Sequence, residues 1–115
     1  MKQDVKAAWI EALNSDAYAQ GAGCLRDYDN KYCCLGVLCE IYRQENPEIR
    51  SWEMINRGVY TFCTGDQRDY RSDVTLPPPV REWAGLQEHE QEVLADLNDG
   101  GVGFSLIAQT IAALL

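Results

Sequence analysis

The sequence has no lysine or arginine after Arg81, and its single histidine is His89. Six acidic residues follow Arg81, so most of the formal net charge of −8 lies in the last third of the chain. Binding to DNA, RNA or an anionic membrane surface requires clustered Lys and Arg. The charge balance therefore argues against direct nucleic-acid or membrane binding. It suits a soluble protein, or one that docks on a basic surface.

Long apolar runs are also absent. No stretch approaches the roughly 18 apolar residues of a membrane span, and residues 1–11 lack the apolar centre of a secretory signal. We therefore expect a cytoplasmic protein.

Metal-ligand and phosphate-binding patterns are missing too. No glycine-rich loop matches a nucleotide-binding motif. Cys34 and Cys39 are five residues apart, which on a helix separates them by about 140° and keeps both from facing one metal ion. We expect no metal and no cofactor. The odd total of five cysteines and the missing secretion signal favour reduced thiols buried as small apolar side chains.

A cysteine nucleophile is the remaining route to catalysis. Cys33 and Cys34 lie near a predicted helix N-terminus, which lowers a thiol pKa. Their apolar neighbours indicate burial, and Glu88 and Glu90 flank His89 and favour its charged, non-basic form. We therefore expect no catalytic residues. A thiol-dependent enzyme using Cys33 or Cys34 is kept as the alternative.

The length predicts a single domain over residues 1–115. Residues 33–43 leave almost no polar face, which predicts a central apolar helix. Further helices are expected at 5–13 with Asp4 as N-cap, at 80–84 with Pro79 in the first turn, at 86–97 with Val93 in the apolar stripe, and at 104–115. Strands are expected at 24–26 and 31–33 around a turn, and at 59–63 with 74–76 as a candidate partner. The pattern predicts an α+β fold, with four to five helices packed around one small antiparallel sheet.

Arginine and aromatic residues are concentrated between residues 50 and 71. Guanidinium groups and rings are the composition of a pocket for a nucleotide-like anion, and equally of a protein-binding hot spot. In a purely structural alternative the rings are core and the arginines pair with nearby acids. The candidate ligand- or partner-binding residues are Arg50, Trp52, Arg57, Tyr60, Arg68, Tyr70 and Arg71. An acidic face of Glu88, Glu90 and Glu92 is a second candidate partner surface.

Several short segments of the chain form a recognisable pattern. They are Trp9–Leu13, Tyr18–Gly21, Leu25–Arg26, Tyr32–Cys39, Leu76–Pro78, Val80, Trp83–Leu86, Leu97–Asp99 and Phe104–Ile111. This pattern resembles a family of small bacteriophage and prophage proteins with no established activity. The resemblance skips residues 44–73 and gives no catalytic residue to carry over. It implies a phage accessory protein that acts in the cytoplasm of a bacterial host.

These features predict a non-enzymatic accessory protein that binds and inhibits or sequesters a bacterial host component, with counter-defence as one version. The partner is expected to be either a host protein or a nucleotide-like immune signal. A virion or assembly component is a further alternative. The sequence does not determine the oligomeric state.

Overall fold

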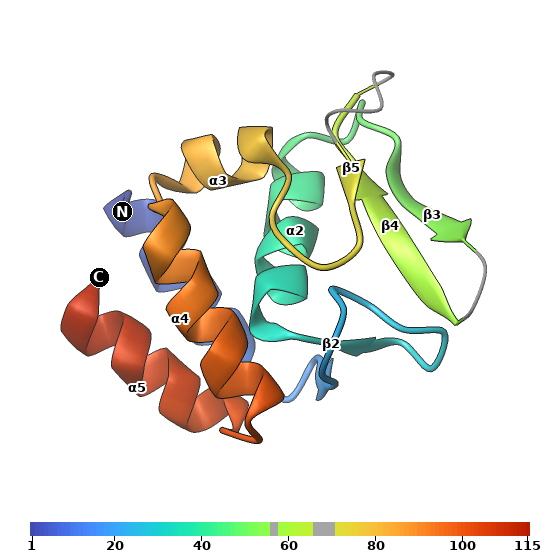
Figure 1. Ribbon diagram of the computed structural model, residues 1–115. Helices are drawn as coiled ribbons and strands as arrows, with labels where there is room; N and C mark the ends of the chain where they lie inside the picture. The colour runs from blue at the N-terminus through green and yellow to red at the C-terminus, as the bar shows by residue number, and fades with distance from the viewer. Residues whose placement is uncertain (56–57, 66–70) are drawn as a thin grey trace.

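The computed structural model describes residues 1–55, 58–65 and 71–115, with only the backbone described at Ile55 and Arg71. Within these ranges the chain forms five helices and two small sheets (Figure 1). The helices are α1 (Gln3–Asn14), α2 (Cys34–Glu45), α3 (Pro78–Ala84), α4 (Glu88–Asp99) and α5 (Phe104–Leu114). The strands are β1 (Ala19–Gln20), β2 (Lys31–Tyr32), β3 (Ser51–Ile55), β4 (Val59–Cys63) and β5 (Arg71–Ser72). The predicted α+β fold class is confirmed.

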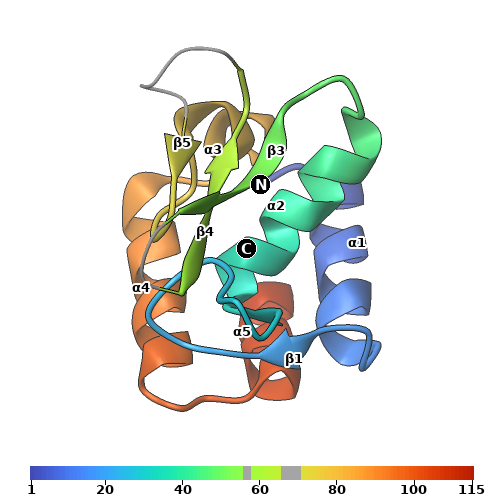
Figure 2. The same cartoon turned by 90° about the vertical axis from the view of Figure 1, so that its right-hand side faces the viewer.

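Helix α2 is the centre of the molecule. It lies between the three-stranded sheet on one side and α1, α4 and α5 on the other (Figures 1 and 2). Every residue from Cys34 to Ile41 is buried, because each side of the helix meets another element. The central apolar helix predicted at 33–43 is confirmed, and it continues to Glu45.

The three-stranded sheet is antiparallel, in the order β3-β4-β5. Strand β4 occupies the predicted residues 59–63, whereas β3 was not expected. The partner strand expected at 74–76 is wrong, because the pairing with β4 is made by Arg71–Ser72. The Ser72 hydroxyl accepts hydrogen bonds from the backbone N–H groups of Val74 and Thr75, and this local turn ends the strand.

A second, two-stranded sheet was also not expected, since one sheet had been predicted. Strand β2 pairs in parallel with β1. The expected pairing of 24–26 with 31–33 is reduced to one antiparallel bridge between Arg26 and Tyr32. A second bridge joins Asp27 to Val59, so this short hairpin lies against the edge of β4.

Two details of the helices differ from expectation. Helix α1 begins at Gln3 with Lys2 at the cap position, so Asp4 is not the cap but lies in the first turn, where its charge suits the helix dipole. Val93 was placed in the apolar stripe of α4, yet 51% of it is exposed, because Gln91, Leu94 and Asn98 form the inward face. The predicted position of Pro79 in the first turn of α3 is confirmed.

Candidate functional site

The cysteine-rich segment that begins α2 is packed away from the surface. Cys33 is 4% exposed, and Cys34 and Cys39 are 0% exposed. Burial raises the pKa of Cys33 to about 11 and also raises the pKa of Cys34 and Cys39. Because the thiolate is the nucleophile, these sulfurs hold very little of the reactive form at neutral pH. All five cysteines are thiols.

Gly36 allows α2 to lie directly against the backbone of Leu25. A Cβ atom at Gly36 would lie 1.9 Å from the Leu25 carbonyl oxygen. The Leu25 backbone is held on both sides, since its N–H donates to Asp73 O at 2.8 Å and its oxygen accepts from Cys33 N–H at 3.2 Å. The next residue, Arg26, is therefore held between α2 and the three-stranded sheet.

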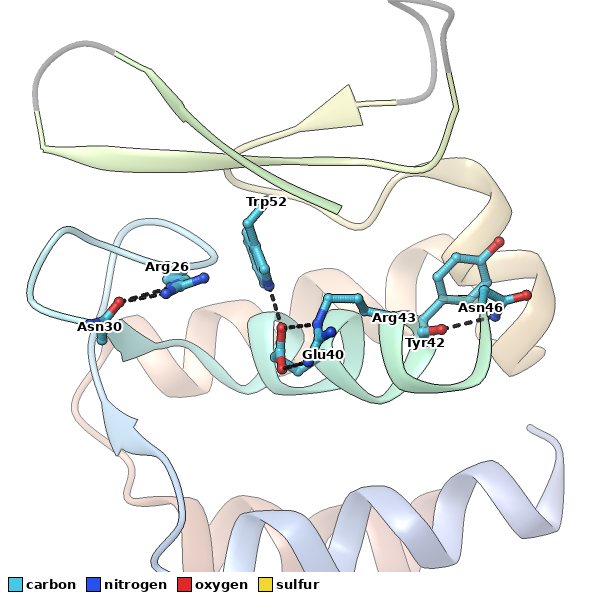
Figure 3. Close-up of polar contacts among 7 residues, drawn as sticks. All are labelled: Arg26, Asn30, Glu40, Tyr42, Arg43, Asn46 and Trp52. Carbon is cyan, nitrogen blue, oxygen red and sulfur yellow. Dashed lines mark hydrogen bonds and ion pairs between the residues drawn. The ribbon is translucent and has the colours of Figure 1, made fainter. Parts of the chain in front are cut away.

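Arg26 lies among three aromatic rings, and we call these four residues the Arg26 cluster. The guanidinium carbon is 4.2 Å from the ring centroid of Tyr60, 5.4 Å from that of Tyr32 and 5.5 Å from that of Trp52. These distances allow cation–π attraction. The Arg26 Nε and Nη2 groups also donate to Asn30 Oδ1 at 3.1 and 2.6 Å (Figure 3). The guanidinium is thus fixed in position before any partner arrives.

A buried carboxylate joins α2 to β3 next to this cluster. Glu40 is 8% exposed and accepts hydrogen bonds from Arg43 Nε at 2.8 Å, Arg43 Nη2 at 3.0 Å and Trp52 Nε1 at 2.5 Å (Figure 3). Burial alone would raise the Glu40 pKa. The hydrogen bonds from Arg43 and Trp52, with the charges of Arg43 and Arg26, outweigh burial and hold this pKa below its usual value of 4.5. The carboxylate stays charged at neutral pH and fixes the Trp52 ring.

Exposed apolar side chains continue this site outward. Tyr28 is 41% exposed and Met54 is 62% exposed. Met54 is the cross-strand partner of Tyr60, and the Tyr28 ring meets Tyr60 edge-on with 5.6 Å between the centroids. We call Arg26, Tyr28, Met54 and Tyr60 the aromatic surface. Arginine, tyrosine and methionine are the residue types enriched in protein interfaces.

The seven candidate residues of the middle segment do not form one described site. The structure brings Trp52 and Tyr60 together in the Arg26 cluster, with a centroid separation of 6.5 Å. Arg50 is exposed and pairs with Glu53 on β3. Arg57, Arg68 and Tyr70 lie outside the described residues, and Arg71 contributes its backbone to β5.

The three acids of the second candidate surface differ in role. Glu88 and Glu92 are exposed and lie one turn apart on α4. The half-buried Glu90 carboxylate accepts a hydrogen bond from Gln87 N–H at 2.8 Å and so caps the start of the helix. Glu90 therefore has a structural role as well.

Gln20 and Asn98 form a polar clasp at the opposite end of α4. Asn98 is 2% exposed, and its Oδ1 accepts from Gln20 Nε2 at 3.0 Å and from Cys34 N–H at 3.1 Å. Its Nδ2 donates to Gly21 O at 2.7 Å, and Gln20 Oε1 accepts from Phe104 N–H at 3.0 Å. The clasp satisfies backbone donors at the starts of α2 and α5. Gln20, Gly21 and Asn98, which belong to the pattern of short segments described above, thus stabilise the fold.

Sequence reasoning missed Arg26, which is the arginine at the centre of the site. It lies in the segment predicted as a strand at 24–26, before the arginine-rich middle segment, so composition did not select it as a site residue; in the structure it lies outside any named helix or strand. The sequence feature that could have indicated Arg26 is its position between Leu25, which is buried, and a turn flanked by Tyr28 and Tyr32.

Within residues 1–55, 58–65 and 71–115, no three His, Cys, Asp or Glu residues are grouped so as to hold a metal ion. In the same ranges no helix has the length and apolar character needed to cross a membrane.

Comparison with curated proteins and with solved structures finds no match to this chain. A family model described as a domain of unknown function (DUF8296) matches residues 1–115. The chain therefore belongs to the DUF8296 family.

Proposed function

We propose that this protein is a non-enzymatic accessory protein of phage or prophage origin that binds a bacterial host protein and inhibits or sequesters it, with the aromatic surface as the contact region. Counter-defence is the form of this activity that we favour. The proposal rests mainly on one observation, the arginine that is fixed among aromatic rings beside exposed Tyr28 and Met54.

The preorganisation of Arg26 supports a binding role. Its guanidinium is held by Asn30 and by the rings of the Arg26 cluster, so little side-chain freedom is lost when a partner docks. Tyr and Arg are the residues that most often dominate binding energy in protein interfaces. The exposed Met54 adds an adaptable apolar contact.

The surroundings of Arg26 favour a protein partner over a nucleotide-like anion. Two of the guanidinium N–H positions already donate to Asn30. Asp27 and the exposed Asp29 follow within the same short hairpin and repel a phosphate group. A protein surface with apolar groups and backbone carbonyls suits this site better.

The thiol-enzyme alternative receives little support from the buried sulfurs. The pKa of Cys33 is raised to about 11 by burial, which opposes formation of a nucleophile.

Affinity capture from a bacterial lysate tests the proposal. The wild-type chain is compared with a Tyr28→Ala/Met54→Ser variant and with Val74→Ser, a matched control because Val74 is 50% exposed. We expect one host protein to be retained by the wild type and by the control, and to be depleted about tenfold by the double variant. Equal capture by all three would rule out the aromatic surface. A nucleotide that copurifies in stoichiometric amount, detected by native mass spectrometry, would replace the protein partner.

A further inference from the structure

An apolar groove lies between α4 and α5, away from the three-stranded sheet. Its volume is about 220 Å³, and its lining includes Val93, Leu94, Leu114 and Leu115 with Thr110 at the side. Figure 1 shows α4 and α5 side by side at the edge of the molecule, on the opposite side of α2 from the sheet. The groove is therefore separate from the aromatic surface.

The outer face of α5 is unusually apolar for an exposed helix. Residues 100–115 contain no charged side chain. Ile107, Ala108 and Ile111 face the core, whereas Leu114, which lines the groove, is 72% exposed. Leu106, outside the lining, is 55% exposed. Val93, from α4, adds a 51% exposed side chain to the same groove. Contiguous exposed apolar groups of this kind mark sites of interaction.

Acidic residues border the α4 side of the groove. Glu90 is part of the lining, and Asp96 lies three residues after Val93, hence on the same side of the helix. Glu92 is exposed one turn before Asp96, and these two acids lie beyond Val93 on the outer side of α4 rather than in the lining. No Lys or Arg occurs after Arg81, so His89, which also lines the groove, is the one basic side chain that α4 and α5 contribute beside these acids.

The acidic residues near the groove favour one kind of binding partner over another. The α4–α5 face of a second copy would bring no Lys or Arg to pair with these acids. A helix with one apolar face and a lysine- or arginine-rich border would bury its apolar side chains in the groove and pair its charges with Glu92 and Asp96. We propose that the α4–α5 groove docks a basic amphipathic helix of a partner protein. This inference goes beyond the proposed function and does not depend on the aromatic surface.

A synthetic peptide serves as the probe. It has about 14 residues, near the shortest length that forms a helix, with leucines at helical spacing and lysines elsewhere. One control peptide replaces lysine with glutamate, and a second scrambles the leucine and lysine order. Binding of the labelled peptides to the full chain is measured by fluorescence anisotropy.

Three variants localise the binding. Val93→Ser/Leu114→Ser removes apolar contacts, Glu92→Gln/Asp96→Asn removes charge, and Val74→Ser is the matched control at an equally exposed valine elsewhere. All substituted side chains are exposed, and circular dichroism confirms folding of each variant. We expect the lysine peptide to bind, with affinity lowered about tenfold in the first two variants and unchanged in the third. The glutamate peptide should not bind, and the scrambled peptide should bind about tenfold more weakly.

Other outcomes would overturn the proposal. They are no binding of the lysine peptide at high micromolar concentration, equal binding of the scrambled peptide, or equal binding by the Val93→Ser/Leu114→Ser variant. A wild-type dimer in sedimentation equilibrium that this variant abolishes would assign the groove to a second copy. The Tyr28→Ala/Met54→Ser variant should bind the lysine peptide as the wild type does, so failure at the groove and failure of the aromatic surface are told apart.

Discussion

Gly36→Ala sets two physical effects against each other. In the interior of a helix, alanine is favoured over glycine by about 1 kcal/mol. At this position, however, the new Cβ would lie 1.9 Å from the Leu25 carbonyl oxygen and 2.8 Å from the Leu25 carbonyl carbon. Both atoms belong to backbone that is buried and hydrogen-bonded on either side. Relief of the overlap therefore requires α2 or the segment that carries Arg26 to move.

The steric effect should be the larger one. Overpacking of a core costs about 1–3 kcal/mol and sometimes more, and an overlap with fixed backbone belongs at the upper end. After subtraction of the helix gain, we expect a net loss of about 2–3 kcal/mol in the free energy of unfolding. For a chain of this size the melting temperature should fall by about 10 °C.

Urea and thermal unfolding followed by circular dichroism measure this loss. Gly103→Ala is the control, because its nearest atom to an added Cβ is Gln20 Oε1 at 4.0 Å. The control should change stability by about 1 kcal/mol or less. A Gly36→Ala protein as stable as the wild type would refute the close contact between α2 and Leu25, and with it the positioning of Arg26.

Three further changes test the polar contacts. Glu40→Gln should cost about 1–3 kcal/mol at pH 7. Because folding lowers the Glu40 pKa, the stabilisation by the carboxylate is present above pH 4.5 and is lost as the pH falls through the pKa of the folded state. The difference in free energy of unfolding between wild type and variant, measured with urea, should therefore decrease at acidic pH. A difference that does not change with pH would contradict the ion-pair role. Trp52→Phe keeps a ring but removes the N–H donor to Glu40 and should cost about 1 kcal/mol in urea unfolding, whereas an unchanged midpoint would show that the hydrogen bond is unimportant. Asn98→Ala leaves the Cys34 N–H and the Gly21 oxygen without their hydrogen-bond partner and should lower the free energy of unfolding by about 3 kcal/mol in the same assay. The control Asn14→Ala, at an exposed position, should have almost no effect. Similar values for the two variants would contradict a stabilising role of the clasp.

The local patterns in the sequence predict much of the fold. The all-round apolar character of residues 33–43 locates α2, and the β-rich run 59–63 matches β4. Strand β3 was missed because Ser51–Ile55 includes polar residues and is stabilised by its pairing with β4. The parallel pair β1–β2 depends on contacts between distant segments, such as that of Gln20 with Asn98, which no local pattern contains.

The candidate site was predictable only in part, because it also depends on contacts between segments that are distant in the sequence. Trp52 and Tyr60 were selected by composition, but the arginine between them comes from the earlier hairpin. Which of several arginines stacks on a ring depends on the tertiary arrangement. Val93 was instead assigned wrongly to the core. Its helical spacing predicted burial, but it lines the groove between α4 and α5 and is exposed.

Iodoacetamide labelling of the native protein, mapped by tandem mass spectrometry, tests most directly whether the cysteine-rich segment is packing or chemistry. At neutral pH we expect Cys33, Cys34 and Cys39 to stay unmodified until denaturant is added, while the partly exposed Cys24 is labelled first. Labelling of native Cys33 or Cys34 faster than Cys24 would contradict the account and favour a thiol-dependent enzyme.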